Sequence, residues 1–475
     1  MPRLAQLALA LAALSPAALA QPAYIRDSIK YGEDLGGFEG PFYNGEQFGA
    51  GVCVLGDLDK DGVTDIAVGV PRALGNRGAL WIIYRNPDGT VKSRTRISSG
   101  ESGFPEIPAD TYFGCAVANL GDLDGDGAPE LAVGAFSDDD PASGSGAVHI
   151  LRLNPQGTVK STLRIAHNAG GFDATLHAGD AFGYKVFALG DINNDGAPDL
   201  GVHARGDNEL KGALWILLLN PDQSVLHATK IGHESGGWPL PLDQFDRFGT
   251  SAIPYMDVDA NGVTDLLVGA PGREPEHTGS GEVFLFKLNP DGSLLEHHSV
   301  LRGTLYDQLG AGLARIDDIN RDGLDDLVVG GDRFYFYAPR EDGSWTLLCA
   351  APGACGSING VFQSGGAPYA EIDTGDLDSD GLIDLLAGAP NDDGADKNGS
   401  DRGAAYAIHL SNCPIDYASP HGVLDFSDIS EFLIGLDRME DHTDLARPYG
   451  VFDFSDVLFF LQLYADYCDM GPTIN

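Results

Sequence analysis

The stretch DLDGDGAPELAVGA, residues 122–135, decides the fold of this chain. It places aspartates at its first, third and fifth positions, a glycine at the sixth and an acid at the ninth, and an apolar run follows directly. Five further copies of the acidic pattern, about 65 residues apart, begin at Asp57, Asp191, Asp257, Asp318 and Asp376. A period of this length indicates a repeat protein rather than a series of unrelated domains.

Each repeat contains segments for four strands. A Phe-Gly pair precedes the acidic loop in the first four copies, at residues 48–49, 113–114, 182–183 and 248–249. An apolar run follows the loop, a third run such as Ala79–Tyr84 comes next, and a turn such as Asn86–Gly89 leads into a more polar fourth segment. Four strands per unit, repeated around a ring, predict a mainly β chain folded as a six-bladed β-propeller. A seven-bladed ring is the alternative if one divergent blade escapes the pattern, and a solenoid would need shorter units.

The two ends of the repeat array predict how the ring closes. The sixth repeat shows strand segments around residues 384–387 and 404–410 but no fourth strand. The segment Tyr24–Ile29, followed by Gly-Gly-Phe at residues 36–38, matches the fourth-strand segments of other repeats. The amino-terminal strand is therefore expected to complete the last blade, which leaves no sheet edge open.

The repeats resemble FG-GAP repeats, which form the blades of the integrin α-chain propeller and of many secreted bacterial proteins. The resemblance covers residues 21–411 and is strongest at Phe113-Gly114, Asp122–Glu130 and Gly134-Ala135. The fifth copy departs from the pattern with Leu309-Gly310, and the sixth departs from it at residues 362–366. Any difference in these two blades is expected in their packing rather than in their cation loops.

The acidic loops have the composition of calcium sites. Alternate carboxylates converge where the glycine lets the chain turn, and a backbone carbonyl at the seventh position and an acid at the ninth complete six or more oxygen ligands. The predicted ligands are Asp57, Asp59, Asp61, Val63 and Asp65; Asp122, Asp124, Asp126, Ala128 and Glu130; Asp191, Asn193, Asp195, Ala197 and Asp199; Asp257, Asp259, Asn261, Val263 and Asp265; Asp318, Asn320, Asp322, Leu324 and Asp326; and Asp376, Asp378, Asp380, Leu382 and Asp384. An acidic turn can also use its carboxylates to bind its own backbone, but six copies in register favour about six Ca²⁺ sites. The resemblance implies that these ions stiffen the hairpin between the first two strands of each blade, a structural rather than catalytic role.

Charge and the amino-terminal segment define the class of protein. The chain carries 70 acidic and 29 basic residues, a net charge of −41, which disfavours nucleic-acid and anionic membrane partners. Residues 1–20 have a basic start, an apolar centre and a small-residue site ending at Ala20, the layout of a secretory signal peptide. No later apolar stretch approaches the roughly 20 residues of a membrane span. These features predict a secreted, cell-surface or periplasmic protein.

The carboxy-terminal segment, residues 412–475, forms a separate module in this interpretation. Two related segments, 416–428 and 444–456, each run into apolar residues at helical spacing, between Cys413 and Cys468. This duplicated loop and helix is similar to a dockerin domain, in particular the cysteine-bracketed planctomycete type. Its loops carry Ser419, His421, Arg447 and Tyr449 where a calcium loop needs acids, so calcium binding is not expected there. Asp425 and Asp453 are better interpreted as helix N-caps.

Six cysteines in an exported chain suggest disulfides. The expected pairs are Cys413 with Cys468 around the tail, Cys349 with Cys355 across a short loop, and Cys53 with Cys115 between neighbouring blades. The tripeptide Arg205-Gly206-Asp207 spells an adhesion motif but lies at a loop position that varies between copies, so no adhesive role is predicted for it. No nucleophile elbow, His-Glu-x-x-His motif or phosphate loop occurs, and no catalytic residue is predicted.

These features predict an exported, calcium-binding and non-enzymatic scaffold for adhesion or ligand binding. A protein or glycan ligand would use loops on one rim of the propeller or its central channel. The dockerin-like tail would tether the scaffold to a cohesin-like or other cell-surface partner. The alternative is a carbohydrate-active enzyme, a glycoside hydrolase or lyase, with its site at the propeller axis and its tail recruiting it to an assembly.

Overall fold

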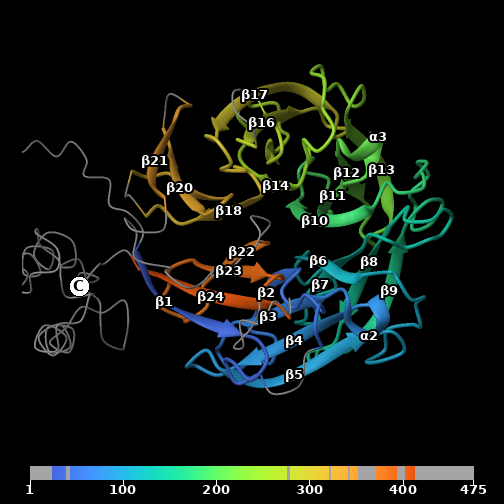
Figure 1. The fold of residues 1–475 in the computed structure, drawn as a ribbon, viewed down its shortest axis with the longest axis vertical. Coiled ribbons are helices and arrows are strands. Elements are labelled where there is room, and N and C mark those ends of the chain that lie inside the picture. The colour runs from blue at the N-terminus through green and yellow to red at the C-terminus, as the bar shows by residue number, and fades with distance from the viewer. Residues whose placement is uncertain are drawn as a thin grey trace, which may run out of the picture.

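A computed structural model of the chain describes residues 24–38, 43–274, 279–319, 322–340, 343–350, 371–392 and 402–411. The predicted signal segment at residues 1–20 and the dockerin-like tail at residues 412–475 lie outside the described residues. Within the described ranges, 24 strands form six antiparallel sheets of four strands each, arranged in a ring (Figure 1). The predicted six-bladed propeller is therefore confirmed.

Successive blades follow the chain order. The first five are β2 (Val52–Gly56), β3 (Asp65–Val70), β4 (Ala79–Arg85) and β5 (Val91–Ser98); β6 (Phe113–Asn119), β7 (Glu130–Ala135), β8 (Ala147–Leu153) and β9 (Val159–Ile165); β10 (Phe182–Gly190), β11 (Asp199–Ala204), β12 (Ala213–Leu219) and β13 (Val225–Gly232); β14 (Ser251–Pro254), β15 (Leu266–Ala270), β16 (Glu282–Leu288) and β17 (Leu294–Arg302); and β18 (Gly312–Ile316), β19 (Asp326–Gly330), β20 (Phe334–Pro339) and β21 (Trp345–Ala350). The sixth consists of β22 (Ile372–Gly375), β23 (Asp384–Ala389), β24 (Ala404–Ser411) and β1 (Tyr24–Tyr31). Two short helical turns, α2 (Ala73–Asn76) and α3 (Asp207–Leu210), connect the second and third strands of the first and third blades.

The amino-terminal strand closes the ring. β1 pairs antiparallel with β24, in a register that runs from Tyr24 opposite Ser411 to Tyr31 opposite Ala405. The two strands lie side by side in Figure 1, with β1 in blue and β24 in orange. The predicted closure by residues 24–29 is thus confirmed, and the strand extends two residues further.

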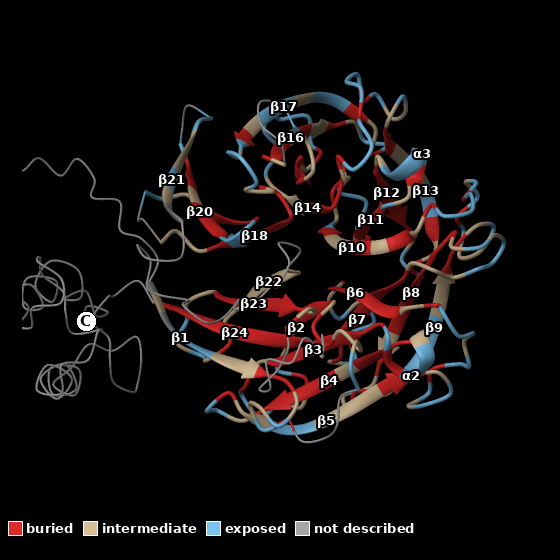
Figure 2. Ribbon diagram, in the orientation of Figure 1, coloured by how far each residue is buried: buried red, intermediate tan, exposed pale blue. Residues whose placement is uncertain are grey.

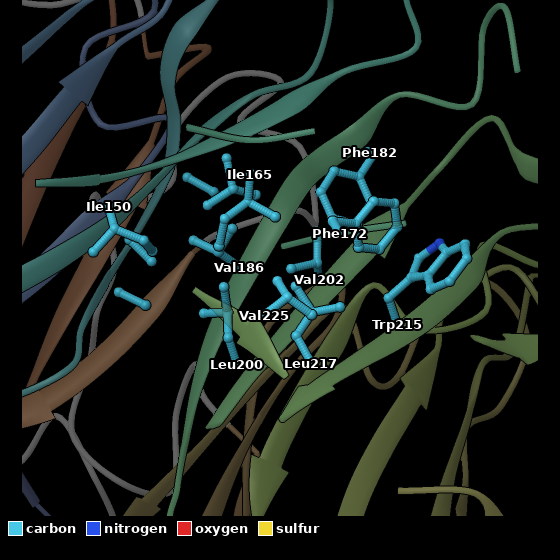
Figure 3. Packing of buried hydrophobic residues seen from close by; sticks show 14 of the residues in the cluster. Ile150, Ile165, Phe172, Phe182, Val186, Leu200, Val202, Trp215, Leu217 and Val225 are labelled. Carbon is cyan, nitrogen blue, oxygen red and sulfur yellow. The ribbon is translucent and has the colours of Figure 1, made fainter. Parts of the chain in front are cut away.

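Apolar side chains fill the spaces between adjacent blades. The second strand of every blade is buried at each of its positions, whereas the outermost strands, such as β5 and β9, are exposed to solvent over part of their length (Figure 2). Figure 3 shows one such interface, in which Ile150 and Ile165 of the second blade pack with Val186, Leu200 and Trp215 of the third. A blade cannot bury both of its faces alone, so each depends on its neighbours for much of its hydrophobic stabilisation.

The Phe-Gly pairs act as joints between blades. Phe113 is fully buried and forms a parallel bridge with Gly78 of the preceding blade, and Phe182 makes the same bridge with Gly146. Leu309, which replaces phenylalanine in the fifth blade, is also fully buried and pairs in the same way with Gly281. The fifth joint therefore keeps its geometry, while residues 362–366 of the sixth copy lie outside the described residues.

The prediction of a disulfide between Cys53 and Cys115 is wrong, because both are free, buried thiols. Cys53 packs into the apolar cluster between the first and second blades, whereas Cys115 packs into the cluster between the second and third. The Cys115 thiol donates to the carbonyl of Gly183 at 3.2 Å, and burial raises its pKa to about 11. Both side chains point toward the next blade along the chain, so they do not face each other. The other predicted pairs involve residues outside the described set.

Candidate metal centres on the blade loops

The first aspartate of every acidic loop shapes the turn. Both carboxylate oxygens of Asp57 accept backbone hydrogen bonds, from Asp61 N–H at 2.9 Å and from Gly62 N–H at 2.8 Å. The same pair of bonds recurs in the other five loops. Gly62 adopts a φ of 91°, in the left-handed region that glycine enters without steric cost. The glycine at the sixth position is therefore required by the turn itself.

This turn brings the predicted ligand carboxylates together. One oxygen from each of the first, third and fifth residues lies within 4.8 Å of the others in the first, second and sixth loops. In the fourth loop the acids at positions one, three and nine, Asp257, Asp259 and Asp265, converge in the same way. The third loop has an amide at Asn193, which pairs with Asp195, and Asn320 of the fifth loop lies outside the described residues.

The residue at the seventh position donates its N–H to the carboxylate at the fifth, as Val63 does to Asp61 at 2.9 Å. Val63, Ala128, Ala197 and Val263 bury their side chains and so anchor the loops to the blades. Ligation by the backbone carbonyl of this position stays a prediction.

The ninth acid connects the loop to the blade, a role that the sequence pattern did not reveal. Asp65 is fully buried and accepts from Leu58 N–H at 3.1 Å and from Arg85 N–H, on the third strand, at 3.0 Å. Asp199, Asp265 and Asp384 make the equivalent pair of bonds. Burial raises the pKa of Asp65 to about 6 and of Asp384 to about 7, against the opposing effect of these backbone donors. A cation beside such a carboxyl would favour its charged form.

Lysines from the outer strands reach the first two loops. Lys92 on β5 lies 2.8 Å from Asp59 and 2.5 Å from Asp61, and Lys160 on β9 contacts Asp124 and Asp126 at 2.7 and 2.8 Å. The signal for this pairing is a repeated Thr-Val-Lys at residues 90–92 and 158–160, which the sequence analysis missed. The other oxygen of Asp59, Oδ1, is buried without a hydrogen-bond partner within the described part of the chain. A buried carboxylate oxygen without a hydrogen-bond partner, within a cluster of acids, is the kind of oxygen ligand that a hard cation such as calcium takes.

A second feature lies on the axis of the ring. Innermost strands from all six blades line a cavity of about 670 Å³. Its charged groups have partners: Lys185 forms a buried ion pair with Glu371, Asp373 accepts from Val54 N–H at 2.7 Å, and Arg315 forms an ion pair with Asp325. Asn119 donates to the carbonyl of Val54 at 3.0 Å. The channel therefore combines an apolar wall with a few fixed polar groups, as small-molecule sites do.

Comparison with known proteins finds a repeat family that matches part of the blade array. Residues 57–133, which include the first two acidic loops in full, match the FG-GAP-like repeat family. The chain carries an FG-GAP β-propeller.

Curated relatives of this FG-GAP propeller include integrin α chains. Integrin alpha-PS2 of Drosophila melanogaster is 31% identical over 246 residues, which are 50% of this chain and 16% of that protein. Integrin alpha-5 of Xenopus laevis is 39% identical over 94 residues, 20% of this chain and 9% of that one. Phosphatidylinositol-glycan-specific phospholipase D of Homo sapiens is 27% identical over 386 residues, 70% of this chain and 42% of that protein. The chain thus spans less than a quarter of the length of these integrin relatives and under half of the phospholipase.

The Arg-Gly-Asp tripeptide packs against its own blade. Asp207 is buried and forms an ion pair with Lys230 at 2.5 Å, and the Arg205 guanidinium lies 4.9 Å from the ring centre of Tyr184. That the tripeptide has no adhesive role stays a prediction. Among the described residues, no helix has the length and apolar character needed to cross a membrane.

Proposed function

We propose that this FG-GAP propeller is an exported, calcium-binding and non-enzymatic scaffold that binds a protein or glycan ligand. The observation that carries the proposal is the convergence of loop carboxylates in the first, second, fourth and sixth blades. The dockerin-like segment, residues 412–475, would tether the scaffold to a cohesin-like or cell-surface partner. Export would follow from the signal segment at residues 1–20.

Calcium would have a structural role in this proposal. When bound, the ion supplies positive charge that offsets the mutual repulsion of the acids at positions one, three and five. The first acid already fixes the turn through two backbone bonds, and the ninth already joins the loop to the third strand. The loop residues therefore hold their geometry in advance, so that the first and second strands of each blade would be stiffened with little rearrangement.

The channel and the loops of one rim are the surfaces proposed for the ligand. The polar channel groups favour binding over catalysis, because Lys185 and Glu371 neutralise each other and both oxygens of Asp373 accept backbone hydrogen bonds. A catalytic acid or base needs a carboxyl that can reach the substrate proton. Similarity to integrin α chains supports a role in binding protein ligands.

A carbohydrate-active enzyme at the axis, a glycoside hydrolase or lyase, is the second candidate. The observation in its favour is that Glu371 and Asp373 both line the channel, where burial raises the pKa of Asp373. Glycosidases use a pair of carboxyl groups, of which the general acid has a raised pKa. The similarity to a phospholipase D shows that a related chain can belong to a hydrolase.

Two measurements on the full chain test the proposal. Isothermal titration of the calcium-free protein should show more than three calcium sites and a clear preference over magnesium, and finding none would overturn the calcium assignment. A glycan array run beside hydrolysis assays should show binding without turnover. Turnover that is lost in both Glu371→Gln and Asp373→Asn would instead establish the enzyme.

A further inference from the structure

The sixth acidic loop differs from the others by a histidine. One ring nitrogen of His409, on β24, lies within 4.8 Å of a carboxylate oxygen of Asp378 and one of Asp384, the third and ninth acids of that loop. The strand register explains the approach, because Leu385 pairs with Ile408 and so sets Asp384 opposite His409. This cluster is built from two neighbouring strands and the loop, rather than from the loop alone.

The orientation of the His409 ring is fixed by the amino-terminal strand. Its Nδ1 is hydrogen-bonded to the carboxylate of Asp27 on β1, and because a carboxylate only accepts, Nδ1 carries the proton. The lone pair of the neutral ring is then on Nε2. The His409 side chain is only 5% exposed, and Nε2 is buried without a hydrogen-bond partner among the described residues. Nε2 is therefore the ring nitrogen that remains available to bind a cation in the cluster that His409 forms with Asp378 and Asp384.

No other blade has a comparable nitrogen in this place. In the second blade the register sets Arg152 opposite the ninth acid, Glu130. The same register gives the equivalent residues of the other four blades, which are Tyr84, Leu218, Lys287 and Ala338. None of these side chains is an imidazole, so among the six positions only His409 can add a neutral nitrogen ligand beside the ninth acid.

We propose that the sixth loop binds a transition-metal ion of the Zn²⁺ class through Asp378, Asp384 and Nε2 of His409, with Asp27 as a positioning residue. Imidazole with carboxylates is a donor set for zinc and its neighbours, whereas calcium takes oxygen ligands almost exclusively. A carboxylate that holds the second nitrogen of a ligating histidine is the usual support for such a site. The proposal deepens the cation-binding role proposed above for the sixth loop and does not depend on calcium in the other five.

The position of this site gives it a consequence for the ring. Asp27 belongs to β1, Asp384 begins β23 and His409 lies on β24, so the ion and its support would join three of the four strands of the closing blade. Asp378 also belongs to the all-acid cluster with Asp376 and Asp380. Asp384 is the predicted ninth-position calcium ligand of the same loop, so zinc and calcium would share two ligands here, Asp378 and Asp384.

The decisive experiment measures zinc stoichiometry in the full chain. Metal-free protein is dialysed against Zn²⁺ in the presence of excess Ca²⁺, and bound zinc is counted by mass spectrometry. His409→Leu installs the residue that the third blade carries at this position, and it should bind one zinc fewer than the wild type. Lys287→Leu, at the equivalent place in the fourth blade, is the matched control and should bind as much as the wild type. Equal zinc in the wild type and in His409→Leu, or no zinc in either, would overturn the proposal.

Two further variants separate this site from the calcium sites. Asp27→Asn should weaken zinc affinity about 10- to 100-fold through the lost support of His409, with calcium titration unchanged. Asp376→Asn should weaken calcium in the sixth loop while the wild-type zinc count is retained. If circular dichroism shows that His409→Leu does not fold, the zinc affinity of Asp27→Asn becomes the test. A zinc affinity in Asp27→Asn equal to that of the wild type would then reject the site. If the wild type binds zinc at this site but binds no calcium, the calcium-binding function proposed above is overturned while the zinc site stands.

Discussion

Gly69 on β3 and Gly114 on β6 lie so close that a Cβ atom on Gly69 would fall 1.9 Å from the Gly114 carbonyl oxygen. The same contact joins Gly134 to Gly183 at 2.1 Å, Gly269 to Gly310 at 2.1 Å and Gly388 to Gly49 at 2.0 Å. In these four joints the glycine at or just before the start of the first strand of a blade lies against the second-strand glycine of the neighbouring blade. Two separate parts of the repeat pattern have one physical cause, which is the close approach of neighbouring backbones.

Gly69→Ala should destabilise the propeller by about 3 kcal/mol, at the upper end of overpacking costs, because the added methyl meets backbone that cannot move aside. Urea unfolding measures the change. Gly32→Ala is the matched control, since a Cβ there would meet its nearest atoms at an ordinary 3.7 Å. Equal losses in the two variants would mean that glycine is needed at position 69 for another reason.

Asp124→Ala should remove one calcium site from the titration, because its carboxylate belongs to the cluster of the second loop. Lys160→Met should keep that site and tighten it, since the ammonium now contacts both Asp124 and Asp126. In the tail, Asp425→Ala should cost about 1 kcal/mol through a lost helix cap and leave the calcium count unchanged. A full calcium count in Asp124→Ala would contradict the ligand assignment.

Stability should fall in acid partly through His149. Burial lowers the pKa of this side chain to about 4, and neither ring nitrogen has a hydrogen-bond partner among the described residues. Between pH 6.5 and pH 4 the unfolded chain therefore binds a proton that the folded chain does not, and the free energy of unfolding falls by up to about 1.4 kcal/mol per pH unit.

His149→Leu removes this proton uptake. Its stability relative to the wild type should rise between pH 7 and pH 5, as measured by urea unfolding at both values. The acidic loops titrate in both proteins, so their contribution cancels in the comparison. His227→Leu, at an exposed position on β13, should show no such rise, and a rise of equal size would assign the effect to something other than burial.

Deleting residues 21–31 should open the ring, because this removes β1 and exposes the edge of β24. The melting temperature should fall sharply and aggregation should increase. Truncation from Asn412 is the comparison, and it should change the melting of the propeller little because it removes the proposed separate module. An amino-terminal deletion that melts like the intact chain would show that β1 contributes little to closure.

Local features of the repeat were predictable from the sequence. The loop spacing, the glycine at the sixth position and the Phe-Gly pairs gave the strand order and the blade count, because each reflects contacts within one blade or a fixed joint to the next. The role of the ninth acid was missed in part. Its bond to the third strand, as from Arg85 to Asp65, spans 20 residues, and no short pattern marks it.

The pairing of cysteines shows where such reasoning fails. The expected bond joined Cys53 and Cys115 on neighbouring blades, but the Cys115 thiol faces Gly183 of the third blade. The register of β6 is irregular between Phe113 and Val117, around this cysteine. The sequence contains the two cysteines, while the local backbone decides which cluster each one joins.

By itself, the sequence determined the repeat, the acidic loops and the strand that closes the ring, since these depend on spacing, turn geometry and alternation along short segments. Only the tertiary structure decided which distant side chains meet. Lys185 and Glu371 are 186 residues apart in the chain and form an ion pair in the channel, and Asp27 and His409 are 382 apart and share a hydrogen bond. The physical reason is ring closure, which brings the ends of the array together and fixes contacts whose sequence separation carries no periodic signal.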